Sequence, residues 1–347
     1  MSTFVSEIYD QPDRIVATVL SVQKQLETLQ PLVQKFQQGD FQRVVFTGMG
    51  SSLSCVYPSL LRLNRQGLSI HVVEASELLY YQTSLLNLNT LLVATSQSGR
   101  SAEIPGLIEI AAKNQSTLLG ITNTADSPLY KHSNATLLMQ AGLEATVSTK
   151  TYTCTLALLH LLTTALLNEP VTEAITDILA LAESIRGYLD QWQQQVAALA
   201  HNWAGTGFLE YLGRGTSLAS ATTAALISKE SIKIPTESMN AGQFRHGPIE
   251  LVDKDFTGIL FLGDALTSDL NSELARDIVG YGGRLAVISH TDLGLPNTTW
   301  IAIPECHPML MPLVEIIPIQ LLCAAMSVQR GYEAGQFRYI SKVTLQE

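Results

Sequence analysis

The sequence has few charged residues, no run of basic ones and no closely spaced cysteine pair. Charged side chains make up 15% of the 347 residues and hydrophobic ones 46%, a balance that excludes a disordered chain and is typical of a compact enzyme. Acidic residues outnumber basic ones by 31 to 21 and give a formal net charge of −10. This acidity argues against nucleic acid as a partner. The length is sufficient for two domains.

Disulfides, a signal peptide and a membrane span are not expected. None of the four cysteines stands in a Cys-x-x-Cys motif, and each lies in an apolar segment, which indicates reduced, buried thiols in a cytoplasmic protein. Met1–Asp10 lacks the basic and apolar regions of a signal peptide. The uncharged stretch Thr151–Leu167 is short for a span and lacks aromatic anchors, so it predicts a helix buried beside a sheet and no membrane association.

Short apolar runs alternate with helical patterns along the first half. Residues 12–38 predict an amphipathic helix that Pro31 kinks or splits. Five strands are then expected, at residues 43–46, 70–73, 91–94, 117–122 and 135–139. Continuously apolar strands separated by helices are typical of a parallel sheet covered on both faces. The fold class is therefore α/β, doubly wound and flavodoxin-like.

The second half repeats the first. Residues 46–54 align with residues 211–219, each with a Gly-x-Gly turn, and the later strands and long apolar helix keep nearly the same spacing. Two copies of one α/β domain are therefore expected. The predicted parts are an N-terminal helical segment (1–38), a first domain (39–170), a helical linker (171–200), a second domain (201–335) and a C-terminal tail (336–347).

The third predicted strand runs into a cluster of polar residues, Ser96–Ser101, and a helical pattern follows. Such a turn directs N–H groups and hydroxyls at one point, where a phosphate monoester fits without a lysine or a metal. An ordinary Ser/Gly turn with an N-cap serine explains the same residues. The equivalent position in the second half, Phe261–Asp264, has no serines and carries an acidic residue. One phosphate site of this kind is therefore expected, in the first half.

Two residues of the second half are candidates for proton transfer. His246 lies in a polar, glycine-rich run and precedes Gly-Pro; a histidine titrates near neutral pH, although an exposed loop histidine is the plainer interpretation. Glu230 lies in a largely apolar helical segment. A carboxylate there costs folding free energy unless it has a charged partner or a catalytic role. Lys229 or Lys233 could supply an ion-pair partner.

Taken together, these motifs resemble a known family. The chain is similar, over nearly its whole length, to the isomerase half of glutamine:fructose-6-phosphate amidotransferase, a double sugar-isomerase (SIS) protein. The resemblance implies two tandem SIS domains, each a parallel sheet flanked by helices, a sugar-phosphate substrate, and neither metal nor organic cofactor. The matching motifs are Gly48–Ser52, Ser96–Gly99, Val147–Lys150, Leu212–Gly215, Lys229–Glu230 and Arg245–Pro248.

The resemblance also implies roles for individual residues. Glu230 corresponds to the base that moves a proton between C1 and C2, and His246 to a ring-opening histidine that reaches the site from the other subunit of a homodimer. Lys342 corresponds to a tail lysine that assists at the ring and carbonyl end. Phosphate binding is implied for Ser51, Ser52, Ser96, Gln97, Ser98 and Ser101, and sugar contacts for Thr146 and Ser148.

Two departures from the family change the expected reaction. No cysteine nucleophile stands near the start, so we expect no glutaminase domain, and Ile227 occupies the position of a family lysine. The missing ammonia supply favours hydrolytic deamination of glucosamine 6-phosphate to fructose 6-phosphate and ammonia. Ile227 removes a charge near the reacting centre, which argues against a reaction identical to that of the family. The alternatives are a fructosamine-6-phosphate deglycase, a galactosamine-6-phosphate deaminase, another phosphosugar aldose–ketose isomerase, or a non-catalytic sugar-phosphate sensor.

Overall fold

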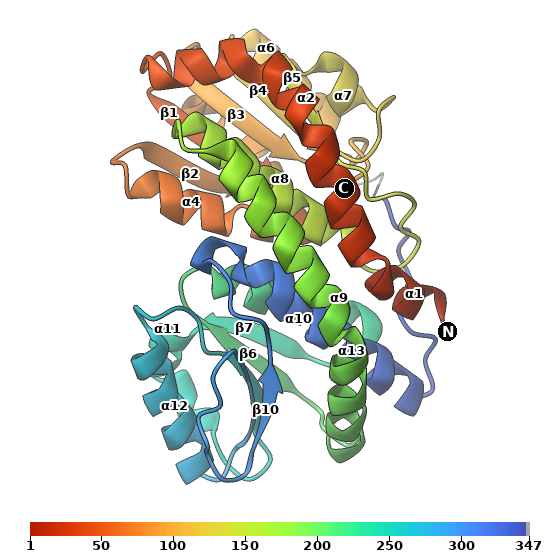
Figure 1. Ribbon diagram of the computed structural model, residues 1–347. Helices are drawn as coiled ribbons and strands as arrows, with labels where there is room; N and C mark the ends of the chain where they lie inside the picture. Colours follow the sequence, from red (N-terminus) through yellow and green to blue (C-terminus); the bar gives the residue numbers. More distant parts are fainter. Residues whose placement is uncertain (345–347) are drawn as a thin grey trace. The chain divides into compact units, whose positions relative to one another are not determined.

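The computed structural model describes residues 1–344 and contains two parallel five-stranded sheets (Figure 1). The chain divides into two compact units. The β1–β5 unit comprises residues 13–144 and 150–182 and the tail from Tyr339. The β6–β10 unit comprises Met1–Pro12, Ala145–Thr149 and Glu183–Arg338. The predicted α/β class, with parallel sheets flanked by helices, is confirmed.

The two sheets have the same strand order. It is β2-β1-β3-β4-β5 in one unit and β7-β6-β8-β9-β10 in the other, so the first strand of each unit lies between the second and the third. This is the flavodoxin-like doubly wound order. Every strand predicted in the first half is present. The strands are β1 (Arg43–Gly48), β2 (Ser69–Glu74), β3 (Thr90–Thr95), β4 (Thr117–Thr122), β5 (Ala135–Leu138), β6 (Leu209–Gly213), β7 (Thr236–Asn240), β8 (Thr257–Phe261), β9 (Arg284–Ser289) and β10 (Thr298–Ala302).

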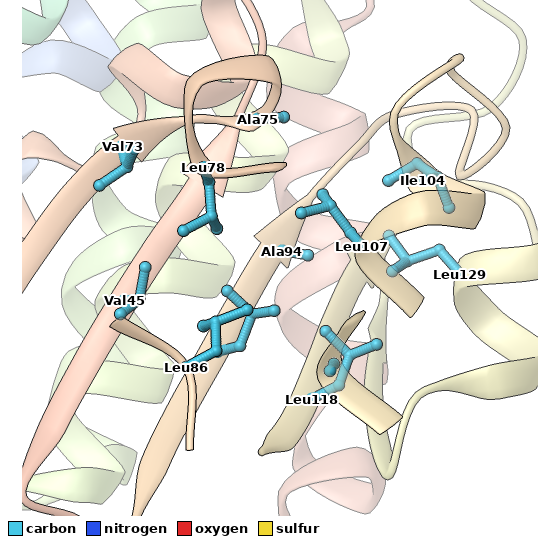
Figure 2. Close-up of a cluster of buried hydrophobic side chains, with 12 residues drawn as sticks. Val45, Val73, Ala75, Leu78, Leu86, Ala94, Ile104, Leu107, Leu118 and Leu129 are labelled. Atoms are coloured by element: carbon cyan, nitrogen blue, oxygen red, sulfur yellow. The ribbon is translucent and has the colours of Figure 1, made fainter. Parts of the chain in front are cut away.

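Helices pack on the β1–β5 sheet through a continuous apolar cluster (Figure 2). Val45 and Leu92 from the strands meet Leu78 and Leu107 from two of the helices, and all four are fully or almost fully buried. Removing these side chains from water stabilises the layer, at about 25 cal/mol per Å² of apolar surface. The cluster includes residues of α5 (Ala75–Tyr81), α6 (Ile104–Lys113) and α7 (Pro128–His132). The other helices around this sheet are α2 (Gln11–Gln37), α3 (Ser51–Ser54), α4 (Tyr57–Asn64) and α8 (Lys150–Leu166), with the 3-10 turn η1 (Thr83–Leu85).

Two of these helices test sequence expectations directly. Almost every side chain of α8 is buried, which confirms the expected buried helix at 151–167 and explains its lack of charge. The helix α2 continues through Pro31, so the proline does not split it. Residues 1–38 nevertheless form two helices, because α1 (Thr3–Tyr9) ends before α2 begins and belongs to the other unit.

Helices cover both faces of the β6–β10 sheet. On one face α11 and α12 pack against Leu212 and Leu260. On the other, the hydroxyl of Tyr211 pairs with Ser228 of α10 at 2.6 Å, and α10 packs on α13. The helices are α10 (Ser217–Ser231), α11 (Ala241–Phe244), α12 (Ser268–Gly280) and α13 (Met311–Gln329), with η2 (Pro248–Leu251) and η3 (Pro308–Leu310); α9 (Val171–Asn202) has residues in both units.

One helical stretch, Pro308–Gln329, is long and apolar enough to cross a membrane by composition. Its apolar window is 94% buried inside the structure, as in a core helix. All four cysteines are free; Cys55, Cys154 and Cys323 are buried as expected, whereas Cys306 is partly exposed. Within the predicted tail 336–347, residues 345–347 lie outside the described part of the chain.

Candidate functional site

Two polar turns lie side by side at the carboxyl edge of the β1–β5 sheet. One follows β1 and contains Ser51 and Ser52; the other follows β3 and contains Ser96–Ser101. β1 and β3 are neighbouring strands, with Gly48 in register with Thr95. The strand order reverses at this point, and ligands of doubly wound sheets bind in the crevice at such a switch point. The structure thus gathers the predicted phosphate-binding residues at one edge.

The turn after β3 is organised by its own hydroxyls. Ser96 Oγ accepts a hydrogen bond from the N–H of Gly99 at 3.2 Å, and Ser98 Oγ accepts one from the N–H of Arg100 at 3.2 Å. The Ser96 and Ser101 hydroxyls lie 3.2 Å apart. Gly99 has φ +60, and a Cβ there would lie 2.2 Å from Ser127 Oγ. The turn therefore requires glycine, because a side chain would displace the loop after β4.

The turn after β1 approaches the β3 turn closely because its first residue is glycine. A Cβ on Gly48 would lie 2.8 Å from the carbonyl oxygen of Thr95. Ser51 and Ser52 open the short helix α3 and are partly exposed. The hydroxyls of Thr47 and Thr95 are buried here and have no hydrogen-bond partner among the described residues. Both turns therefore bring polar atoms to the strand ends.

Arg100 brings a cation to the rim of this site, which the sequence analysis did not consider. Its guanidinium lies 2.9 Å from a carboxylate oxygen of Asp126 and also donates to the main-chain oxygen of Asp126 at 3.2 Å. The hydrogen bond and charge of Arg100 hold the pKa of Asp126 below its ordinary value. Arg100 thus has an exposed carboxylate partner in the loop before α7.

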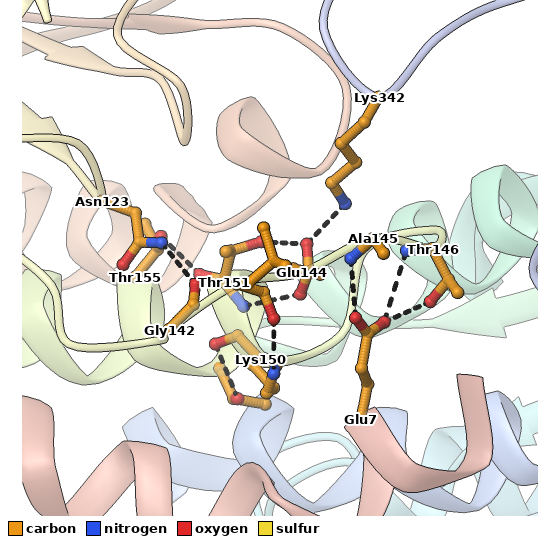
Figure 3. A network of polar contacts seen from close by, with 12 residues as sticks. Glu7, Asn123, Gly142, Glu144, Ala145, Thr146, Lys150, Thr151, Thr155 and Lys342 are labelled. Atoms are coloured by element: carbon orange, nitrogen blue, oxygen red, sulfur yellow. Dashed lines mark hydrogen bonds and ion pairs between the residues drawn. The ribbon is translucent and has the colours of Figure 1, made fainter. Parts of the chain in front are cut away.

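The predicted tail lysine, Lys342, lies in the same unit as the polar turns. Its Nζ is 2.5 Å from Oε2 of Glu144, a carboxylate with no exposed side-chain surface (Figure 3). Glu144 also accepts hydrogen bonds from the N–H of Thr151 at 3.0 Å and its hydroxyl at 2.7 Å. Burial raises the pKa of Glu144, but Lys342 and Thr151 together bring it below the ordinary value. Sequence reasoning missed Glu144 because its charged partner, Lys342, lies 198 positions away in the chain.

The predicted sugar-binding residues Thr146 and Ser148 belong to the β6–β10 unit. Glu7 of α1 accepts hydrogen bonds from the N–H of Ala145 at 2.6 Å and from the hydroxyl of Thr146 (Figure 3). The N–H of Val147 donates to the carbonyl of Gly335 at 3.2 Å. Thr146 is buried and its hydroxyl is engaged by the carboxylate of Glu7, whereas Ser148 is partly exposed.

Glu230 and His246 are also in the β6–β10 unit. Glu230 lies in the last turn of α10 and is partly exposed; the ammonium of Lys233 donates to its main-chain oxygen and, at 2.8 Å, to that of Gln336. Burial and the charge of Arg338 lower the pKa of Lys233, and the charge of Glu230 opposes this. Ile227, one turn earlier, is fully buried. His246 is exposed in the turn between α11 and η2.

The corresponding edge of the β6–β10 sheet has different chemistry. Arg214 follows β6, and its Nε donates to Asn271 at 2.9 Å, while Asp264 follows β8. No serine cluster stands there, as the sequence indicated. Among residues 1–344, no group of three His, Cys, Asp or Glu side chains is arranged to hold a metal ion.

Comparison with known proteins agrees with this architecture. Residues 40–165 match the family model of the SIS domain. The chain is 26% identical, over 97% of its length, to the isomerizing glutamine–fructose-6-phosphate aminotransferase of Thermococcus kodakarensis, of which it spans 57%. The C-terminal domain of glucosamine-fructose-6-phosphate aminotransferase from Francisella tularensis has a TM-score of 0.83 at 21% identity, covering 95% of this chain and 96% of that one. Glucosamine-6-phosphate deaminase from Thermotoga maritima has a TM-score of 0.76 at 18% identity, covering 99% of both chains.

The sheet of the β1–β5 unit, with its helices and its polar switch point, is thus the core of an SIS domain. The chain as a whole is homologous to the isomerase half of glutamine–fructose-6-phosphate aminotransferase, and the equal strand order of its second sheet fits a double SIS protein. It spans little more than half the length of the curated relative described above.

Proposed function

We propose that the protein catalyses the isomerising deamination of an amino-sugar phosphate, converting glucosamine 6-phosphate and water to fructose 6-phosphate and ammonia. The observation that carries the proposal is the pair of polar turns at the β1/β3 switch point, Ser51–Ser52 and Ser96–Ser101. They offer hydroxyls and main-chain amides to a phosphate ester. The homology to a phosphosugar-isomerising half supports a sugar as the rest of the ligand.

The proposed chemistry uses the amine of the substrate. After the ring opens, Glu230 removes the proton from C2 and returns it to C1, while the aldehyde oxygen gains a proton and the amine nitrogen loses one, so that the 2-amino aldehyde becomes a 1-hydroxy 2-imine. Water adds to that imine, and ammonia leaves from C2. Because the nitrogen is already on the substrate, no lysine is needed at position 227, where Ile227 is buried in the core. Lys342 assists at the carbonyl end.

The deamination is tested by measuring both products from purified protein. Glucosamine 6-phosphate should give ammonia and fructose 6-phosphate in equal amounts, and Glu230→Gln should lower the rate by at least about 100-fold. Glu237→Gln, an exposed carboxylate of β7, is the matched control and should retain the rate. Absence of product from wild-type protein would refute this activity.

The same assay separates the other sugar-phosphate reactions. Galactosamine 6-phosphate, a phosphorylated fructosamine, and a neutral aldose phosphate should each be slower than glucosamine 6-phosphate. Faster turnover of any one would reassign the activity to a galactosamine-6-phosphate deaminase, a deglycase or a plain isomerase. Ligand-induced thermal stabilisation without turnover of any of them would indicate a sensor.

The proposed working form is a cytoplasmic homodimer in which His246 serves the site of the partner subunit. His246 is exposed in the turn after α11. This supports the role, because a histidine that serves another subunit must project from the surface of its own. A mixture of Glu230→Gln and His246→Asn chains should regain activity that neither variant shows alone. Failure of freshly refolded mixtures to regain any would refute the shared site.

A further inference from the structure

Within the β1–β5 unit, the C-terminal tail makes one contact directly after the Ser96–Ser101 turn and another with Glu144. The N–H of Ala102, directly after the turn, donates to the carbonyl of Thr344 at 3.1 Å. Two residues earlier in the tail, Lys342 is paired with Glu144 at 2.5 Å. Lys342 is therefore held between one contact at the end of the turn and one at Glu144.

The segment that carries Glu144 is itself attached to the other side of that turn. Asn123 connects them: its main-chain N–H donates to the carbonyl of Gln97 at 2.9 Å, and its side chain bonds the main chain of residues 141 and 142. Lys150 adds a further restraint, because its Nζ donates to the carbonyl of Leu143 at 2.7 Å (Figure 3). Glu144 thus occupies a fixed place relative to Gln97.

The carboxylate of Glu144 is anchored independently of the tail. Thr151, in the first turn of α8, donates its N–H to Oε1 and its hydroxyl to Oε2. The N–H donor belongs to the main chain of α8, so the bond to Oε1 needs neither the Thr151 side chain nor the tail. A charge-assisted bond to a fully buried oxygen is strong and directional.

We propose that Glu144 is the positioning residue for Lys342, holding the ammonium of the tail at a set place beside the phosphate-binding turn. The proposal deepens the proposed deaminase and rests on it for the role of Lys342. Glu144 does not touch the substrate in this account; it acts only through Lys342. The tail contacts Ala102 and Glu144, and these two contacts fix the position of Lys342 relative to the turn that we propose to bind the phosphate.

Two variants separate positioning from structural support. Glu144→Gln has the same shape, and its amide oxygen still accepts from the Thr151 N–H, but it removes the charge that holds Lys342. Thr151→Val removes one hydroxyl bond to Glu144 and leaves the ion pair. If Glu144 only supported the fold, both variants would change Lys342 labelling and kcat alike. If Glu144 positions Lys342, only Glu144→Gln should change them.

The first readout is acylation of Lys342 by an amine-reactive ester, followed by mass spectrometry of the C-terminal peptide. Lys342 has 22% of its side chain exposed in the paired state. We expect Glu144→Gln to raise its labelling rate at least about threefold and Thr151→Val to leave it unchanged. Equal labelling in wild type and Glu144→Gln would overturn the proposal. This readout is independent of the enzymatic activity, so it distinguishes failure of the pair from failure of the proposed function.

The second readout is steady-state kinetics on whichever sugar phosphate the product assay identifies. Glu144→Gln should lower kcat about tenfold and leave KM within about threefold, because the phosphate-binding turn is unchanged. Thr151→Val should retain the wild-type kcat. A rise in KM alone, or equal loss in both variants, would assign Glu144 to binding or to structure and contradict positioning.

Discussion

The α-carbon of Gly99 faces Ser127 so closely that a Cβ on Gly99 would lie 2.2 Å from the Ser127 hydroxyl oxygen. Ser127 caps α7 by accepting the N–H of Tyr130, so it cannot withdraw without loosening that helix. The turn after β3 and the start of α7 are thus fitted to each other. The turn that we propose to bind the phosphate therefore depends on the start of α7 for its shape.

Substitution of this glycine should therefore damage the turn. Gly99→Ala should weaken binding of glucosamine 6-phosphate at least tenfold and destabilise the fold by about 1–3 kcal/mol, since both the positive φ and the contact oppose a methyl group. Titration calorimetry and urea unfolding measure the two effects. Gly39→Ala is the control, because Gly39 also has positive φ but no atom within 4 Å of its Cβ position. Equal effects in both variants would show that the Ser127 contact is unimportant.

Hydroxyls and main-chain amides should contribute more to phosphate binding than Arg100 does. Ser96→Ala removes one of the two acceptors of the Gly99 N–H, since the carbonyl oxygen of Ser96 still accepts from it at 3.1 Å, and it removes the hydroxyl that lies beside that of Ser101. Loss of this hydroxyl should cost about 1–3 kcal/mol and weaken phosphate-ester binding about tenfold or more. Arg100→Gln should weaken it less than about threefold, because Arg100 pairs with an exposed carboxylate. Dissociation constants of the phosphate ester for the two variants, measured at two salt concentrations, show which residue contributes more. A larger loss in Arg100→Gln would make the arginine the main phosphate ligand.

The anchor between Glu7 and Thr146 should matter for stability. Thr146→Val keeps the shape but removes the hydroxyl donor to a buried carboxylate, at a cost of about 1–3 kcal/mol. Thr146→Ser should recover most of that loss. Chemical unfolding followed by tryptophan fluorescence measures it. A Thr146→Val protein as stable as wild type would show that the N–H donors of residues 145 and 146 satisfy Glu7 alone.

Stability should fall as pH rises from about 4.5 to about 7. Burial, and secondarily the charge of Glu237 in the adjacent strand, raise the pKa of Glu210 to about 7 from an ordinary 4.5. The folded state therefore holds a proton that the unfolded state has released, and the free energy of unfolding decreases across this window. The contribution is at most about 3 kcal/mol. Glu315 of α13, whose pKa burial also raises to about 7, adds to the same trend.

The variant Glu210→Gln isolates one of these two carboxyls. It should be more stable than wild type at pH 8, and its unfolding free energy should depend less on pH between 4.5 and 7. Glu237→Gln should produce a smaller change in the same direction, because charge is the lesser cause. Urea unfolding at several pH values measures both. An unaltered pH slope in Glu210→Gln would show that this carboxyl does not titrate in the window.

The strands and polar turns could be predicted because their signals are local. A continuous apolar run marks each buried strand, and the Ser-Gln-Ser-Gly pattern follows one of them directly. The contacts that hold the site were missed because they join distant parts of the chain. Glu7 lies 138 positions from Ala145, and Glu144 lies 198 positions from Lys342. A single acidic residue, whether in a helix like Glu7 or in a loop like Glu144, gives no local sign of a partner that lies far away in the chain.

The most direct test of the account is a crystal structure with glucosamine 6-phosphate bound. The phosphate should lie at the Ser96–Ser101 turn, with its oxygens within hydrogen-bond distance of main-chain amides and serine hydroxyls there. A phosphate bound instead at the edge of the β6–β10 sheet, against Arg214, would contradict the central claim that the serine turns of the SIS domain bind the sugar phosphate.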